Sequence, residues 1–270
     1  YGDHRDLHLS LRRQRQMCIR DRRVLRAHAR ASISATPPNA LEMPCDGDST
    51  DEQKLTTTSN TFWSTQTAKY PNYGTTKKRR FHEINYLVEN IQKMKEGDVL
   101  SLTDVGCGTG STVTVLQELT DIKKYHCYDI SPAMISTIDT SSKRGAHVQT
   151  TVMDFTSIDA SYAFPDTDVT LCFGVLQCLS DADSRALLER LKGKTAFLRD
   201  ACYLPHEGRR DVNTFSEQLN ANYACRYRTL TEYISLCTDS GWKLKDIRRA
   251  FPDEIESAYG TKQWFLHLEK

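Results

Sequence analysis

A glycine-rich segment, Gly106-Cys107-Gly108-Thr109-Gly110, follows the short apolar run at residues 99–105. Because glycine has no Cβ, this segment can turn tightly and can bring backbone N–H groups close to a ligand. The spacing is G-x-G-x-G, whereas dinucleotide-binding proteins use G-x-G-x-x-G, and position 111 is serine. A strand-to-helix turn without a ligand is the structural alternative, so the segment indicates a ligand site only together with its neighbours.

Two carboxylates follow at the ends of the next apolar runs. Asp129 comes about twenty residues after the glycines, where a carboxylate can accept two hydrogen bonds from a ribose diol. Asp154 stands beside Phe155, and this pair suits the amine and the flat face of adenine. Capping of a helix by Asp129, or of a turn by Asp154, is the structural alternative, although Ser131 can also cap that helix.

Two further polar residues are candidates for catalysis. Gln177 follows the run that ends in Phe173-Gly174-Val175-Leu176, and Asp200 follows residues 195–198. A carboxylate at a strand end can orient an amine or accept its proton, and a glutamine can contact substrate or cofactor. For Asp200, a salt bridge with Arg199 is the structural alternative.

These residues lie on an alternation of apolar strands and helices. We expect strands at residues 99–105, 125–130, 148–153, 169–175, 195–198, 242–248 and 263–268. We expect helices at residues 81–91, 111–119, 133–138, 181–191 and 229–238. Such alternation is typical of an α/β fold, a doubly wound and mostly parallel sheet with helices on both faces. Ligands bind such sheets at the carboxyl ends of the strands, where all of these motifs fall.

With these motifs the chain resembles class I S-adenosylmethionine-dependent methyltransferases. The resemblance covers about residues 60–270 and rests on residues 104–110, Asp129, Met153-Asp154-Phe155 and Val175-Leu176-Gln177. It implies a seven-stranded sheet that ends in an antiparallel hairpin, so that the terminal strand is antiparallel. It also implies S-adenosyl-L-methionine as the cofactor and methyl transfer as the activity.

The resemblance further implies a set of cofactor contacts. Asp104 is expected under the methionine ammonium, Asp129 at the ribose and Asp154 toward the adenine amine. The full set of expected cofactor-binding residues is Asp104, Gly106, Cys107, Gly108, Gly110, Asp129, Ile130, Met134, Asp154, Phe155, Phe173, Tyr73 and Arg80. Of these, Arg80 is a candidate because a guanidinium binds a carboxylate with two hydrogen bonds, and a surface position is its structural alternative.

The molecule that receives the methyl group, the methyl acceptor, is expected to contact aromatic residues and a lid. Trp63 and Tyr70 can close over a sulfonium cation, which favours an aromatic face, although Trp63 can also pack against the sheet. Residues 202–228 are longer than the usual connection in an α/β unit, so we expect a substrate-lid insertion there. Its expected substrate-binding residues are His206, Tyr223, Tyr227 and Arg228.

The acceptor class is narrowed by motifs that are absent. Within the expected domain at residues 60–270, the sequence has neither the Asn/Asp-Pro-Pro-Tyr motif used for exocyclic amines of bases nor a Pro-Cys pair of the kind used for attack on cytosine. We therefore expect transfer to an N or O atom of a small metabolite. A non-catalytic S-adenosylmethionine-binding partner protein, a nicotinamide oxidoreductase and a nucleic-acid methyltransferase are the alternatives from other classes.

A fainter resemblance points to protein N-terminal amine methyltransferases. It rests on Arg199-Asp200, Tyr227-Arg228-Thr229, residues 251–255 and residues 70–74. Two departures weaken it, because that family has Asn where this chain has Ala201 and a Trp where it has Gly174. A peptide N-terminus is therefore the alternative acceptor.

Composition excludes several other classes. The 270 residues have a net charge of +1, which provides no basic field for nucleic acid. No apolar run approaches the roughly 18–20 residues that span a bilayer. The nine cysteines form no C-x-x-C pair, which favours reduced thiols and no metal site. We expect a cytoplasmic protein with a small-molecule or peptide partner and no membrane association.

The first 59 residues differ from the rest and are expected to form a flexible extension before a domain at residues 60–270. Nine arginines occur within the first thirty residues, so an organelle transit peptide and a nucleic-acid-binding arm are two explanations. However, Gln16-Met17-Cys18-Ile19-Arg20-Asp21-Arg22 resembles a translated sequencing adapter, which favours a non-native origin for about residues 1–23.

Overall fold

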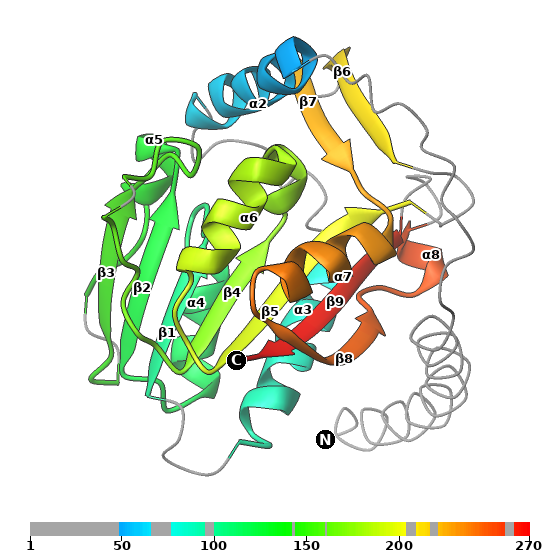
Figure 1. Cartoon of the computed structure of the whole chain (residues 1–270). Helices are drawn as coiled ribbons and strands as arrows, with labels where there is room; N and C mark the ends of the chain where they lie inside the picture. Colours follow the sequence, from blue (N-terminus) through cyan, green and yellow to red (C-terminus); the bar gives the residue numbers. More distant parts are fainter. Residues whose placement is uncertain are drawn as a thin grey trace. The chain divides into compact units, whose positions relative to one another are not determined.

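Seven strands form one twisted sheet in the order β3-β2-β1-β4-β5-β9-β8 (Figure 1). The computed structural model describes residues 49–65, 77–94, 100–141, 144–159, 161–203, 209–216, 221–256 and 262–270. The strands are β1 (Ser101–Val105), β2 (Lys124–Asp129), β3 (His147–Val152), β4 (Val169–Phe173), β5 (Thr195–Cys202), β8 (Lys243–Arg249) and β9 (Lys262–Glu269). β9 lies between β5 and β8 and runs antiparallel to both, whereas the pairs among β1 to β5 are parallel. The predicted fold class is confirmed, including the antiparallel last strand.

Helices cover both faces of this sheet, as its apolar central strands require. On one face, α3 (Lys77–Ile91) and α4 (Ser111–Leu119) pack in a core that contains Leu102 of β1 and Phe197 of β5. On the other face, α6 (Asp181–Arg190) and α7 (Leu230–Asp239) pack in a core that contains Cys172 of β4 and Leu198 of β5. Burial on both faces explains why β4 is a nearly continuous apolar run.

Short helices begin where the parallel strands end, and side-chain caps fix their first turns. The hydroxyl of Ser131 accepts a hydrogen bond from the Met134 N–H at the start of α5 (Pro132–Ile135). Ser180 caps α6 in the same way, and Thr229 forms a capping box with Glu232 at α7. A 3-10 turn, η1 (Leu176–Cys178), follows β4 directly, and α8 (Asp253–Glu256) separates β8 from β9.

Helix α2 (Ser49–Ser64) and a two-stranded sheet of β6 (Arg210–Ser216) and β7 (Ala221–Tyr227) lie beyond the carboxyl ends of the parallel strands (Figure 1). The helix packs on β7 and on η1, with Leu55, Ser59 and Phe62 buried. The boundary expected at residue 60 therefore falls inside a helix that begins at Ser49. The physical reason for the difference is packing: the buried face of α2 needs β7, which is far away in the sequence.

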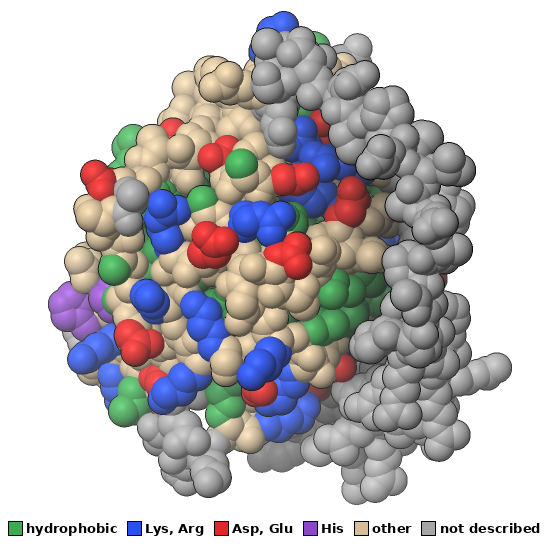
Figure 2. All heavy atoms as spheres, viewed as in Figure 1, with side chains coloured by type: hydrophobic (Ala, Val, Ile, Leu, Met, Phe, Trp, Pro, Cys, Tyr) green, Lys and Arg blue, Asp and Glu red, His purple; other side chains and the backbone are tan. Residues whose placement is uncertain are grey.

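None of the helices in the described ranges is long and apolar enough to cross a membrane. On the face that Figure 2 shows, basic and acidic side chains alternate. Within the same described residues, no cluster of three or more His, Cys, Asp or Glu side chains could hold a metal ion.

Candidate functional site

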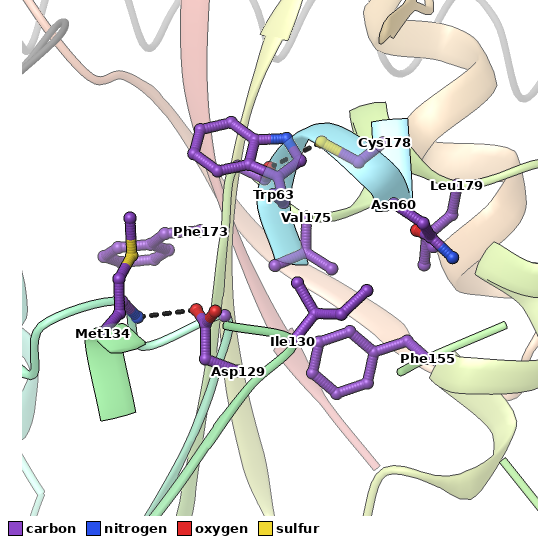
Figure 3. Close-up of a pocket in the computed structure, with 13 residues that line it drawn as sticks. Asn60, Trp63, Asp129, Ile130, Met134, Phe155, Phe173, Val175, Cys178 and Leu179 are labelled. Atoms are coloured by element: carbon purple, nitrogen blue, oxygen red, sulfur yellow. Dashed lines mark hydrogen bonds between the residues drawn. The ribbon is translucent and has the colours of Figure 1, made fainter. Parts of the chain in front are cut away.

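A pocket opens at the carboxyl ends of β1, β2 and β4, beneath α2 (Figure 3). Its cavity volume is about 150 Å³. Most of its lining is apolar, and Asp129 is the only ionisable carboxylate or base among the lining residues. The lining residues are Asn60, Trp63, Gly106, Gly108, Asp129, Ile130, Met134, Phe155, Phe173, Gly174, Val175, Cys178 and Leu179.

The glycine turn forms the floor of this pocket. The backbone N–H groups of Gly106 and Cys107 both donate to the carbonyl of Tyr128, which ties the turn to β2. Gly106 has a φ of 74°, and a Cβ at this position would overlap the Cγ2 of Val175. Glycine is therefore required at position 106 both by the backbone conformation and by the packing of the pocket wall.

Asp129 is held in a fixed orientation at the edge of the turn. Its Oδ2 accepts from the Gly108 N–H at 2.8 Å, and its Oδ1 accepts from the Ser131 N–H at 2.9 Å. Burial raises the pKa of this carboxyl, while the backbone hydrogen bonds oppose that rise. Each carboxylate oxygen has a further lone pair, so Asp129 can still accept two hydrogen bonds from a ligand.

Asp104 lies behind the glycine turn, with only 4% of its surface exposed. No hydrogen bond or ion pair reaches its carboxylate from any of the described residues. Burial, and then the charge of Asp129, raise the pKa of Asp104 to about 7. A carboxylate buried without a partner is costly, and a cation placed beside it would remove that cost.

Asp154 is linked to α2 and does not itself line the pocket. Its Oδ1 accepts from the N–H and the hydroxyl of Thr156, at 2.9 and 2.8 Å. The amide nitrogen of Asn60 donates to both Asp154 oxygens, at 3.0 and 3.2 Å. Asn60 therefore stands between Asp154 and the pocket.

The two expected catalytic residues meet each other below η1, outside the pocket lining. The Gln177 N–H donates to Asp200 Oδ1 at 3.3 Å, and the Gln177 side chain accepts from the Ala201 N–H at 3.4 Å. Asp200 is 3% exposed, and its Oδ2 has no hydrogen-bond partner among the described residues. Burial raises its pKa to about 7. Arg199, the expected salt-bridge partner, instead pairs with Glu83 of α3 at 3.1 Å.

Arg228, which was expected to bind substrate, lies away from the pocket lining. This side chain is fully buried, and its guanidinium donates to Asp181 and to the carbonyls of Leu176 and Leu179, at 2.6–2.8 Å. A guanidinium without solvent access must satisfy its donors internally, and these contacts do so. Arg228 thus holds η1 and the start of α6 together.

The other expected residues are distributed unevenly. Trp63, Ile130, Met134, Phe155 and Phe173 line the pocket. Gly110, Cys107, Arg80, Tyr223 and Tyr227 do not line it. Cys107 is buried, and Arg80 and the two tyrosines are half-buried. Tyr70, Tyr73 and His206 lie outside the described residues.

Tyr223 and Tyr227 instead help to pack the cover of the pocket. The ring of Tyr223 meets Phe62 of α2 edge-on, with centroids 5.6 Å apart. The ring of Tyr227 meets Tyr203 in the same manner at 5.7 Å. These contacts connect the β6–β7 hairpin to α2 and to the end of β5.

Sequence reasoning assigned no role to five lining residues, Asn60, Gly174, Val175, Cys178 and Leu179. Gly174 and Val175 belong to the segment that ends β4, so the position of that segment at a strand end was an available signal. Cys178 ends η1 and Leu179 follows it, and no apolar period in the sequence reveals this turn. Asn60 lies in a Ser/Thr-rich segment that gave no sign of contact with the sheet.

Comparisons with known proteins agree with this geometry. Residues 103–196 match the family described as Methyltransferase domain, a segment that runs from β1 into β5. No curated protein sequence shows significant similarity to the chain.

Solved structures with the same fold include methyltransferases and one enzyme that is named as a cyclase. A SAM-dependent methyltransferase from Leishmania major has a TM-score of 0.59 at 13% identity, over 80% of this chain and 83% of that chain. Magnesium protoporphyrin IX methyltransferase from Synechocystis, with bound SAM, has a TM-score of 0.50 at 14% identity, over 71% and 80%. The [4+2]-cyclase SpnF has a TM-score of 0.51 at 16% identity, over 69% and 81%.

The comparisons establish the fold and one matched segment. The solved structures share with this chain the Rossmann-like fold of class I S-adenosylmethionine-dependent methyltransferases. Residues 103–196, which match the methyltransferase-domain family, contain the glycine turn, Asp129 and the end of β4, and these surround one pocket.

Proposed function

We propose that this protein binds S-adenosyl-L-methionine in the pocket below α2 and transfers its methyl group to an N or O atom of a small metabolite. The observation that carries the proposal is that two carboxylates with different surroundings, Asp104 and Asp129, lie at the glycine turn. One carboxylate is buried without a partner, and the other presents free lone pairs to the pocket.

The residues fit the three parts of this cofactor. The buried Asp104 suits the methionine ammonium, whose charge would lower the pKa of that carboxyl. Asp129 suits the ribose diol, because its orientation is already fixed by two backbone N–H groups. Ile130, Phe155 and Leu179 provide an apolar slot for adenine.

When bound, the cofactor supplies an activated methyl group on a sulfonium. The protein then needs to align the acceptor and exclude water. Trp63 and Phe173 both line the pocket and offer aromatic faces to a cation. Helix α2 and the hairpin of β6 and β7 would exclude water from above.

A small and largely apolar acceptor fits the lining best. Besides Asp129 the lining contains no acidic or basic side chain, so it provides no partner for a phosphate or a nucleic-acid backbone. Asp200 is the proposed proton acceptor, because a carboxyl with a pKa of about 7 can exchange a proton at neutral pH. Gln177 would position it through their hydrogen bond.

A second candidate is cofactor binding without methyl transfer. It is favoured by the structural neighbour SpnF, which is named as a [4+2]-cyclase and has the same fold. It predicts binding of S-adenosylmethionine with no transfer to any acceptor.

The test has two stages. Isothermal titration of the full chain with S-adenosylmethionine, S-adenosylhomocysteine and NADH should give micromolar binding of the first two and none of the third. Transfer of labelled methyl groups is then measured into a metabolite extract and, separately, into peptides with free N-termini. Methyl transfer into the metabolite extract supports the proposal. Methyl transfer into peptides alone would show that the methyl acceptor is a peptide N-terminus and not a small metabolite. Cofactor binding without any methyl transfer supports the second candidate. Failure to bind either sulfur compound would overturn the proposal.

A further inference from the structure

Asn60 is a polar residue of α2 that faces the same pocket as the glycine turn. Its amide nitrogen donates to both oxygens of Asp154 and to the Thr156 hydroxyl, the latter at 3.0 Å. Its amide oxygen has no hydrogen-bond partner among the described residues. Figure 3 shows Asn60 beside Leu179, across the pocket from Asp129.

The orientation of this amide is determined by its neighbours. An ionised carboxylate can only accept hydrogen bonds, so the Asn60 nitrogen, and not its oxygen, must face Asp154. The oxygen is consequently the atom that remains for a ligand. Next to it, Asp154 Oδ2 accepts only the longer of the two Asn60 contacts.

The position of Asn60 is fixed by the packing of α2. On the neighbouring turns, Leu55, Ser59 and Phe62 are buried, and the Phe62 ring contacts Tyr223 of β7. Phe155, which precedes Thr156, lines the pocket together with Asn60. A flat ligand against Phe155 would therefore have its edge near the Asn60 oxygen.

We propose that the amide oxygen of Asn60, which Asp154 and Thr156 hold in place, recognises the 6-amino group of the cofactor's adenine, so that α2 determines the base specificity of the pocket. This inference rests on the proposed function, since it assigns one end of the same cofactor site. An exocyclic amine is a hydrogen-bond donor and the Asn60 oxygen is an acceptor. A base with an oxo group at this position would instead bring a second acceptor against the Asn60 oxygen.

Such an arrangement discriminates between adenine and a base with an oxo group, because polar groups stay unpaired in the complex with the oxo base. A site built to hydrogen-bond an amine rejects an analogue that lacks the donor, because its acceptors then lose water without gaining a partner. The discrimination should therefore depend on the Asn60 oxygen and survive changes elsewhere on α2.

The experiment is isothermal titration of the full-length chain with two ligands that differ at one position. The first is S-adenosylhomocysteine, and the second is S-inosylhomocysteine, in which oxygen replaces the 6-amino group. The wild-type chain should bind the adenine compound at least about tenfold more tightly, the scale of one lost hydrogen bond. In Asn60→Leu, which has a similar size and no acceptor, that ratio should fall to within about threefold of unity.

Thr57→Ala is the matched control, because Thr57 is an exposed residue of the same helix, outside the lining of the pocket. Both affinities and their ratio should stay unchanged in this variant. If Asn60→Leu weakens both ligands equally and keeps the wild-type ratio, Asn60 only fastens α2 and the inference is overturned. If the wild-type chain binds S-adenosylhomocysteine and shows no preference over the inosine compound, the inference also fails while the cofactor assignment stands. Absence of S-adenosylhomocysteine binding to the wild-type chain would overturn both.

Discussion

Asp129 and Asp104 illustrate how neighbouring carboxylates differ through their immediate contacts. Asp129 accepts backbone hydrogen bonds from Gly108 and Ser131, which fix its direction and favour its ionised form. Asp104 has no such donor among the described residues, and burial raises its pKa to about 7. The first suits recognition of neutral hydroxyls, and the second suits a cation.

Replacing Asp129 by alanine should weaken binding of S-adenosylhomocysteine by about 1–3 kcal/mol, the scale of lost charge-assisted hydrogen bonds. Isothermal titration measures this change directly. Asp121→Ala is the control, because that side chain is 85% exposed and lies at the opposite end of β2. Equal affinity in the Asp129 variant and the wild type would show that the ribose lies elsewhere.

At the scale of elements, η1 depends on a side chain from beyond β7. Arg228 donates to the carbonyls of Leu176 and Leu179 and to Asp181, and it is fully buried. The residues that carry these two carbonyls belong to the segment of residues 175–179, in which Val175 and Cys178 line one wall of the pocket. The position of this wall is therefore set by a residue that does not touch the pocket.

Arg228→Ala should destabilise the fold by about 3–5 kcal/mol, because it leaves Asp181 and buried carbonyls without their donor. Chemical denaturation followed by circular dichroism measures the difference. Arg209→Ala is a matched control, since Arg209 pairs with the same Asp181 at 2.7 Å from a more exposed position. Its loss should cost less than about 1 kcal/mol. Similar losses for the two variants would mean that burial does not set the strength of the Arg228 contacts.

Helix α2 leads to a prediction about where the chain can be shortened. A chain that starts at residue 49 keeps the whole helix, whereas one that starts at residue 60 loses the buried Leu55 and Ser59. We expect the shorter chain to bind S-adenosylhomocysteine at least about tenfold more weakly than the longer one, because Asn60 and Trp63 then lose their support. Titration of the two chains side by side measures the ratio. Equal affinities would show that the first half of α2 does not support the pocket.

The sheet could be predicted from the sequence, whereas α2 and its contacts could not. Strands such as β4 are buried on both faces, so their residues are mostly apolar and their glycine-marked ends are visible. The residues of α2 include many Ser and Thr, which are weak helix formers, and their burial depends on a distant hairpin. The burial of Arg228 could not be predicted for a similar reason, since an arginine in a long connection has the same sequence appearance whether it is buried or exposed.

For the whole molecule, two buried carboxyls make the stability depend on pH. The pKa values of Asp104 and Asp200 are raised from 3.8 to about 7, chiefly by burial. Between these values the folded state holds more protons than the unfolded state, so stability falls as pH rises from about 4 to about 7. The carboxyls of Asp181 and Asp211, whose pKa values are lowered in the folded state, act in the opposite direction below about pH 4.

We therefore expect the melting temperature of the ligand-free protein to fall between pH 5 and pH 8. The Asp104→Asn variant has no charge to bury at this position, so its melting temperature should decline less. The corresponding loss of folding stability over this pH range should be smaller than in the wild type by up to a few kcal/mol. Differential scanning calorimetry over this range measures both slopes. Parallel slopes in the two proteins would contradict the assignment of a raised pKa to Asp104.

The location of α2 has a consequence for how the protein is made. Its residues leave the ribosome before any strand of the sheet, yet the Asn60 amide bonds to Asp154 and Phe62 packs on Tyr223, which is synthesised much later. During translation the parallel strands β1 to β5 can assemble while α2 still lacks its partner. The pocket therefore acquires its cover only when β7 has emerged, and a nascent chain interrupted before that point would present an open cleft with little ability to retain a ligand.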